Sequence, residues 1–176
     1  MDLGCGGGEL LEILVKEKSV RAEGIEINEQ AIHQCVAKGL SVINEDIEKG
    51  LGEYADKSFD YVILNQSLQQ VRRLEVVLAD VLRVGKRVIV GFPNFTHYKA
   101  RFQLFFKGKT PVTPSLPYKW YDTPNLHFLS ISDFIEYCHQ KKIKIEKSAY
   151  FSNGSKVRIF PNLFAMLGLF LISKAA

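Results

Sequence analysis

The chain has 176 residues, of which 47% are hydrophobic and 24% charged, and a net charge of +4. This length suits one globular domain with a core of its own, and the hydrophobic share excludes a disordered chain. The longest apolar run, Leu163–Ile172, is far shorter than the ~20 residues of a membrane-spanning helix. With no basic and apolar leader, and with three cysteines too scattered for a disulfide framework or a zinc site, we expect a cytoplasmic protein without a metal.

Short β-branched segments alternate with amphipathic segments in the first half of the sequence. The β-branched segments predict buried parallel strands over Val20–Ile27, Leu40–Ile43, Phe59–Leu64 and Arg87–Phe92. The amphipathic segments predict helices over Glu9–Glu17, over Ala31–Lys38 with Asn28 as N-cap, and over Leu68–Val84. Because strands and helices alternate, we predict an α/β fold of Rossmann-like type with a mostly parallel sheet.

The pattern loosens after Phe92. Residues 95–106 are basic and aromatic, and we predict a helix there. Residues 107–129 contain four prolines and predict an irregular segment, which we call the excursion. A segment of this length without regular structure usually serves a function rather than a simple connection.

The last part of the chain predicts a helix and a hairpin. Ser130 to Asp133 is similar to a capping box and predicts the start of a helix over Phe134–Lys142. Two apolar runs follow, Lys144–Phe151 and Leu163–Ile172. Their short connection predicts an antiparallel hairpin at the edge of the sheet.

The most informative motif lies in the first eight residues. Met1-Asp-Leu-Gly-Cys-Gly-Gly-Gly8 runs from the end of an apolar strand through a glycine turn into a helix. Glycines in such a turn let the backbone approach a ligand closely at the amino end of the helix. Glu26, 20 residues after Gly6, ends the second predicted strand, where a carboxylate can accept both ribose hydroxyls of an adenosine.

Two kinds of cofactor fit a glycine turn of this type. Dinucleotides use the spacing G-x-G-x-x-G, which fails here because Glu9 and Leu11 stand where the third glycine is required. The observed Asp-x-Gly-x-Gly-x-Gly resembles the first motif of class I S-adenosylmethionine-dependent methyltransferases. A sulfonium with an amino-acid tail needs no phosphate-binding turn and tolerates nearby acids. We therefore predict S-adenosylmethionine or S-adenosylhomocysteine as the ligand.

Further segments fit that resemblance in chain order. Asp46-Ile47 follows the third predicted strand and matches the acidic and apolar pair that these enzymes place against adenine. Asn65 lies at the ligand-facing end of the fourth strand. The resemblance implies that the cofactor is bound by Asp2, Gly4, Cys5, Gly6, Gly8, Glu26, Ile27, Asp46, Ile47 and Asn65.

Four longer stretches resemble a narrower family, the bacterial methionine biosynthesis protein MetW: DLGCGGGELL, FDYVILNQSLQQVRR, LRVGKRVIVGFPNF and PVTPSLPYKWYDTPNLHFLSISDF. The resemblance implies a single methyltransferase-like domain over residues 1–176, a role in methionine synthesis, and homoserine O-acyltransferase as a partner. It also implies a helical lead-in and a full first strand before the glycine turn. Here Met1 directly precedes Asp2-Leu3, so we expect a truncated first strand and weaker anchoring of the turn.

Candidate groups for methyl transfer lie in the second half of the chain, where a small metabolite is the expected acceptor. A general base is needed only if the acceptor loses a proton. His127 is one candidate base, with Asp122 or Asn125 to orient it, and a hydrogen-bonded structural histidine is the alternative. His97, on the helix after the fifth strand, is a further candidate.

Charge is distributed unevenly between the two halves. Residues 1–69 hold 6 lysines and arginines against 13 acids, whereas residues 70–176 hold 17 against 6. The acidic half suits a cationic or hydroxyl-rich ligand and the basic half an anionic partner, with solvated helix faces as the alternative. A partner or substrate surface is predicted from the composition of Arg101, Trp120, Tyr121 and Asn125. A lid over the cofactor and plain core are the other interpretations of these residues.

Basic and aromatic residues also interleave over residues 95–109, as they do on single-stranded nucleic-acid-binding surfaces. On a helix, Tyr98, Phe102, Phe105 and Phe106 share one face, and we predict that this face packs inward. No nucleic-acid-binding module is recognised, so nucleic acid is a disfavoured partner.

Two functions stay open: a methyltransferase for a small metabolite, and a non-catalytic, cofactor-sensing subunit that activates homoserine O-acyltransferase.

Overall fold

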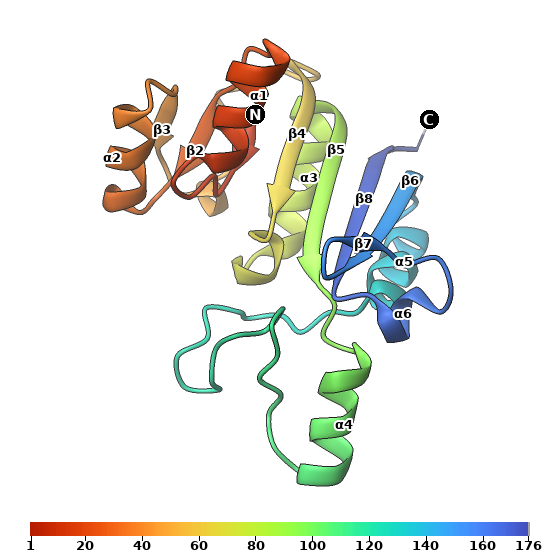
Figure 1. Cartoon of the computed structure of the whole chain (residues 1–176). Coiled ribbons are helices and arrows are strands. Elements are labelled where there is room, and N and C mark those ends of the chain that lie inside the picture. Colours follow the sequence, from red (N-terminus) through yellow and green to blue (C-terminus); the bar gives the residue numbers. More distant parts are fainter. Residues whose placement is uncertain (176) are drawn as a thin grey trace. The chain divides into compact units, whose positions relative to one another are not determined.

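Strands and helices alternate along the chain in a computed structural model that describes residues 1–175 (Figure 1). These residues group into two compact units. The first consists of residues 1–67 and 71–89, and the second of residues 68–70 and the described residues from 90 onward. The fold is α/β, with a mostly parallel sheet and antiparallel last strands, which confirms the predicted fold class.

The first unit is built on a sheet with the strand order β3-β2-β1-β4-β5, in which β1 pairs in parallel with both β2 and β4. The strands are β1 (Asp2–Leu3), β2 (Gly24–Glu26), β3 (Val42–Asn44), β4 (Phe59–Asn65) and β5 (Gly85–Pro93), which continues into the second unit. The helical segments are α1 (Glu9–Lys18), α2 (Glu29–Ala37), α3 (Leu74–Val84) and the 3-10 turn η1 (Ile47–Lys49). Asn28 caps α2 as predicted, because its Oδ1 accepts from Ala31 N at 3.0 Å.

The central strand β1 is two residues long, which agrees with the short first strand expected from the sequence. The neighbouring strand β2 begins at Gly24, not at Val20 as predicted, and Gly24 pairs with Asp2 of β1 and Val42 of β3. Asp2 N donates to Glu23 O at 2.9 Å, directly before this pairing begins. A mostly apolar cavity of about 540 Å³ lies beside this point, between α1, β4 and the lead into β2.

The helix predicted over Leu68–Val84 is wrong in its first third, because α3 begins only at Leu74. A 3-10 turn, η2 (Leu68–Gln70), and an extended Val71 precede it. The Glu48 carboxylate accepts from Arg72 N at 2.8 Å and from Arg73 N at 3.3 Å. This contact from a segment distant in the sequence supplies the acceptors that the amino end of α3 lacks locally, so the helix starts after it.

The second unit has the strand order β5-β8-β6-β7. Its further elements are α4 (Tyr98–Lys107), α5 (Ile131–Gln140), β6 (Ile143–Ser152), β7 (Ser155–Lys156), α6 (Pro161–Phe164) and β8 (Leu167–Lys174). Its core includes three phenylalanine rings, with the centroid of Phe134 at 5.0 Å from that of Phe92 and 4.8 Å from that of Phe170. Within residues 1–175, no helix is both long and apolar enough to span a bilayer.

The caps and hairpin of the second unit follow the sequence closely. Ser130 Oγ accepts from Asp133 N at 3.1 Å and Asp133 Oδ2 from Ser130 N at 2.8 Å, which confirms the capping box. Strands β6 and β8 pair antiparallel, as the predicted hairpin requires. The second strand was expected to begin at Leu163, but Pro161 opens the short helix α6 instead, as proline commonly does at a first helical position.

The prediction that the aromatic face of α4 packs inward is wrong. Phe102, Phe105 and Phe106 are 53%, 83% and 68% exposed, and Tyr98 is 45% exposed. Ala100 is the only residue of α4 that is fully buried. In the part of the chain that the structure describes, α4 therefore carries a solvent-facing aromatic face.

We predict that Glu48→Ala lowers the free energy of unfolding by about 1–2 kcal/mol, because Arg72 N and Arg73 N lose their acceptor and the helix dipole loses a favourable charge. Urea unfolding measures the change. Glu53→Ala, at an exposed position, is the matched control and should be near neutral. Equal stability of the two variants would contradict the capping role of Glu48.

Candidate cofactor site

The glycine loop, Gly4–Gly8, connects β1 to α1, and its positions differ in what surrounds them. Gly8 has φ 80°, and a Cβ there would lie 2.6 Å from Leu40 Cδ1 and 2.8 Å from Cys35 Sγ. Gly6 has φ 54°, and a Cβ there would meet no atom within 4 Å. Gly8 is therefore required by close packing inside the unit, whereas Gly6 faces open space from which a ligand can approach the backbone.

The Glu26 carboxylate links the glycine loop to the end of β2. Its Oε2 accepts from Gly6 N at 2.8 Å, and its Oε1 accepts from Ile27 N and Asn28 N, both at 2.9 Å. Three backbone donors fix the orientation of this carboxylate. A carboxylate offers about four acceptor positions, so Glu26 retains capacity to accept from a ligand hydroxyl.

The side chains of Asp2, before the loop, and Cys5, within it, are buried. Asp2 is 3% exposed, and burial, with the nearby charge of Glu26, raises its pKa to about 6. Burial and the adjacent Cys35 raise the pKa of the Cys5 thiol to about 12. Cys35 Sγ in turn donates to Gly6 O at 3.2 Å. The Cys5 thiol is therefore protonated at neutral pH and is not an activated nucleophile.

The other predicted cofactor residues follow the ends of β2, β3 and β4. Ile27 is 62% exposed directly after Glu26, and Asn65 is exposed at the end of β4. Asp46 is half-buried and caps η1 by accepting from Glu48 N at 2.9 Å. Glu45 N donates to Glu26 O at 3.1 Å, which places Asp46 close to the end of β2. Parallel α/β sheets bind ligands at this edge.

Sequence reasoning missed Ser67. A Cβ added to Gly4 would lie only 2.9 Å from the Cβ of Ser67, so Ser67 packs directly against the glycine loop. Its buried hydroxyl has no hydrogen-bond partner within residues 1–175. The polar run Asn65-Gln66-Ser67 after an apolar strand is the sequence signal that could have identified this position. A buried, unpaired hydroxyl beside the loop is suited to contact a bound ligand.

The candidate catalytic residues belong to the second unit. His97 is 1% exposed, its Nδ1 accepts from Lys99 N at 3.4 Å, and its Nε2 has no hydrogen-bond partner among the described residues. Burial, followed by the charge of Lys99, lowers the pKa of His97. His127 is half-buried and its backbone N donates to Gln69 O at 3.0 Å, whereas Asp122 is exposed. Their roles in methyl transfer stay predictions.

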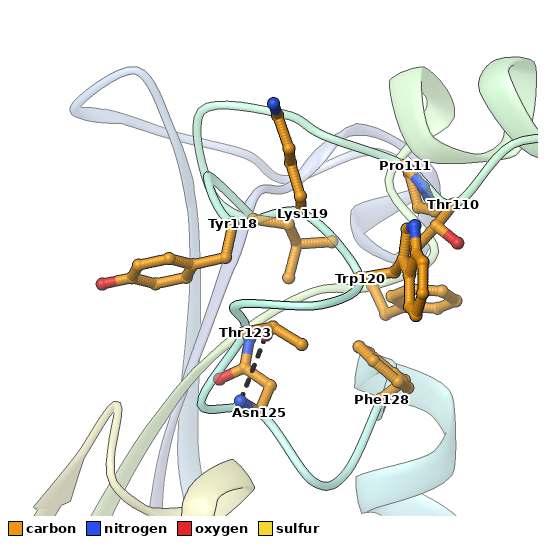
Figure 2. A pocket seen from close by; sticks show the side chains of 10 residues that line it. Thr110, Pro111, Tyr118, Lys119, Trp120, Thr123, Asn125 and Phe128 are labelled. Atoms are coloured by element: carbon orange, nitrogen blue, oxygen red, sulfur yellow. Dashed lines mark hydrogen bonds between the residues drawn. The ribbon is translucent and has the colours of Figure 1, made fainter.

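Figure 2 shows the excursion around Trp120, with the indole beside Thr110 and Pro111. Trp120 is 74% and Tyr121 62% exposed, so the plain-core interpretation of this pair is wrong within the described chain. Their rings meet edge to face at 5.6 Å. The pocket that Trp120 lines measures about 10 Å³, which is too small for a metabolite.

The other two residues of the predicted partner surface differ in their surroundings. Asn125 is half-buried and lines the same pocket, whereas Arg101 belongs to α4, and its Nε donates to Thr96 O at 2.6 Å.

A glycine loop fixed by an acid at the end of the next parallel strand is typical of Rossmann-like folds, and the fold of this chain is that of methyltransferase-like proteins. Solved structures agree on this fold. A SAM dependent methyltransferase from Archaeoglobus fulgidus matches with a TM-score of 0.71 and 20% identity, over 98% of this chain and 84% of that one. An S-adenosylmethionine dependent methyltransferase from Mesorhizobium loti matches with a TM-score of 0.68 and 17% identity, over 97% of this chain and 88% of that one.

The chain belongs to the family described as methionine biosynthesis protein MetW, which matches residues 1–172. A curated relative, the bifunctional methionine biosynthesis protein MetXA/MetW of Rhodopirellula baltica, is 32% identical in an alignment that is 171 residues long and covers 92% of this chain. The chain spans 27% of the length of that relative.

The raised pKa of Asp2 predicts a pH-dependent stability. The folded state holds a proton that the unfolded state releases at lower pH, so the contribution of Asp2 to stability is full below about pH 4 and is lost, by about 3 kcal/mol, as the pH rises through about 6. Asp2→Asn should remove this decline. Urea unfolding between pH 4 and 8 measures it, with Asp122→Asn as an exposed control that keeps the slope. If the free energy of unfolding of Asp2→Asn depended on pH as that of the wild type does, the pH dependence would not come from Asp2.

Proposed function

We propose that the first unit binds S-adenosylmethionine or S-adenosylhomocysteine, and that the chain acts in cytoplasmic methionine biosynthesis as a methyltransferase-like protein. One observation carries the proposal: the Glu26 carboxylate holds Gly6 N at 2.8 Å while Gly6 faces open space. A ligand that reaches Gly6 therefore meets a fixed carboxylate beside an approachable backbone.

The residues around this point suit an adenosyl ligand with a positive charge. Glu26 accepts from the ribose hydroxyls, and the exposed Ile27 with the half-buried Ile47 offers apolar surface to the adenine ring. Asp2, Asp46 and other acids of this unit favour a sulfonium and an ammonium group over a pyrophosphate. The remaining polar contacts of the ligand fall to Asn65 and the backbone of Gly4–Gly8.

When bound, S-adenosylmethionine supplies an electrophilic methyl group, and the protein has to hold a nucleophile in line with it. Positioning alone removes a large part of such a barrier. We propose a small metabolite as the acceptor. His127, Asp122 and His97 are the candidates for removing a proton where the acceptor carries one.

Calorimetric titration with S-adenosylmethionine, S-adenosylhomocysteine and NAD tests the cofactor proposal. We expect binding of the two adenosyl ligands and none of NAD. Because charge-assisted hydrogen bonds contribute ~1.5–3 kcal/mol, Glu26→Ala should weaken binding by roughly 10- to 150-fold. Absence of binding to the folded wild-type protein would overturn the proposal.

A matched glycine pair separates ligand contact from loop strain. Gly6 and Gly39 both have positive φ, 54° and 73°, and a Cβ at either position meets no atom within 4 Å. Gly6→Ala and Gly39→Ala therefore carry similar backbone strain. Only Gly6→Ala should reduce affinity for S-adenosylhomocysteine, because Gly39 lies after α2 and outside the glycine loop.

A second candidate function is a non-catalytic subunit that binds homoserine O-acyltransferase and activates it when the cofactor is bound. The relative from Rhodopirellula baltica favours it, because its MetW part is joined in one chain to a MetXA part. Joining two proteins raises their effective concentration and is useful when they act together. A cofactor made from methionine would then report the output of the pathway to an enzyme of that pathway.

Co-purification with homoserine O-acyltransferase tests the second candidate. We expect a stable complex and higher acyltransferase activity when the chain is added, with a dependence on S-adenosylmethionine that Glu26→Ala abolishes. Trp120→Ala tests the surface predicted from the sequence. Equal activation by Trp120→Ala and the wild type would exclude Trp120 from the interface, and failure of the wild type to bind would exclude the second candidate.

A further inference from the structure

Helix α4 exposes a continuous aromatic face that neither proposed function has used. Tyr98, Phe102, Phe105 and Phe106 follow the spacing i, i+4, i+7 and i+8, which places them on one side of the helix. Their exposed fractions run from 45% to 83%. Large aromatic groups gathered on one surface mark an interaction site more often than scattered ones do.

The rings of this face are ordered by contact with one another. The Phe106 centroid lies 4.6 Å from that of Phe102 and 4.8 Å from that of Phe105. Rings that already restrain each other lose little further freedom when a partner covers them. The face is therefore prepared for binding before a partner arrives.

Hydrogen bonds at both ends of α4 hold the helix in place. The buried His97 caps its amino end, and Arg101 Nε donates to Thr96 O at 2.6 Å. Near the other end, the Gln103 amide pairs with both backbone groups of Val112, at 2.9 Å and 3.0 Å. Within the second unit, α4 projects away from α5 and the hairpin of β6 and β8 (Figure 1). The aromatic face is thus displayed on a fixed, protruding helix.

The charges around the aromatic face all have one sign. From Pro93 to Tyr121, within the second unit, the sequence contains five lysines and arginines and no acid. Lys99 and Arg101 flank the aromatic face on either side, and Lys107 and Lys109 lie at the end of the helix. A partner that covers the rings also meets these cations, so its rim is expected to be acidic.

We propose that α4 inserts its aromatic face into an apolar groove with an acidic rim on homoserine O-acyltransferase. The spacing of the four rings is that of helices that bind in grooves of other proteins. A protein is favoured over a lipid surface or nucleic acid because most of the Rhodopirellula baltica relative lies outside the matched MetW part and joins a second protein to it. This inference rests on the second candidate function and places its interface.

The double variant Phe105→Ala, Phe106→Ala tests the inference by titration against purified homoserine O-acyltransferase of the same organism. We expect binding to weaken about 10- to 100-fold, as for the loss of central aromatic anchors. Both side chains are exposed, so the fold should be unchanged, as circular dichroism checks. Ile159→Ala is the control, because Ile159 is 72% exposed in the same unit and lies outside α4.

A charge-reversal pair tests the acidic rim separately. Lys99→Glu with Lys107→Glu should slow association and reduce its dependence on salt concentration, whereas Lys147→Glu on β6 should leave both unchanged. If the α4 variant and Lys147→Glu changed association equally, the hypothesis that the partner's groove has an acidic rim would be wrong.

The outcomes distinguish this inference from the function on which it rests. Unchanged binding of the phenylalanine variant to an acyltransferase that binds the wild type overturns the α4 interface and leaves the second candidate standing. No binding by the wild type overturns both. If the variant instead loses binding to phosphatidylglycerol vesicles, to a single-stranded RNA or to a second copy of the chain, while acyltransferase binding persists, the surface serves that other ligand and the inference is wrong.

Discussion

The candidate site depends on one carboxylate. Glu26 accepts hydrogen bonds from Gly6, Ile27 and Asn28, and so ties the glycine loop to the end of β2. Without it, a loop with three glycines in the left-handed region has little to hold it in one conformation. The same carboxylate is also the group best placed to accept from a ribose. Loop geometry and ligand recognition therefore rest on the same side chain.

The two units differ in chemistry as well as in sequence position. The first unit is acidic around its glycine loop, burial raises the pKa of its Cys5 thiol, and we propose that it binds a small cationic ligand. The second exposes aromatic rings among lysines and arginines and offers a surface suited to a larger, acidic partner. The proposed subunit, which senses a cofactor and activates another protein, requires both kinds of surface.

The errors of the sequence analysis have a common physical cause. The helix expected from Leu68 starts at Leu74 because Glu48, more than twenty residues earlier, binds its amino end. Strand β2 is shorter than its β-branched run because its pairing with β1 and with β3 starts only at Gly24. The aromatic face of α4 points outward, and α4 packs against the rest of its unit mainly through Ala100, its one fully buried residue. Each outcome depends on a contact that local sequence does not contain.

The sequence by itself determined the α/β class, the glycine loop, the acid after β2, the capping box at Ser130 and the antiparallel last strands. These features arise from local spacing, turn chemistry and periodicity, which act within a few residues. Only the tertiary structure decided that Gly6 is open while Gly8 is packed, that Ser67 adjoins the loop, and that the rings of α4 face solvent. Packing between distant segments sets these properties, and no single stretch of sequence encodes it.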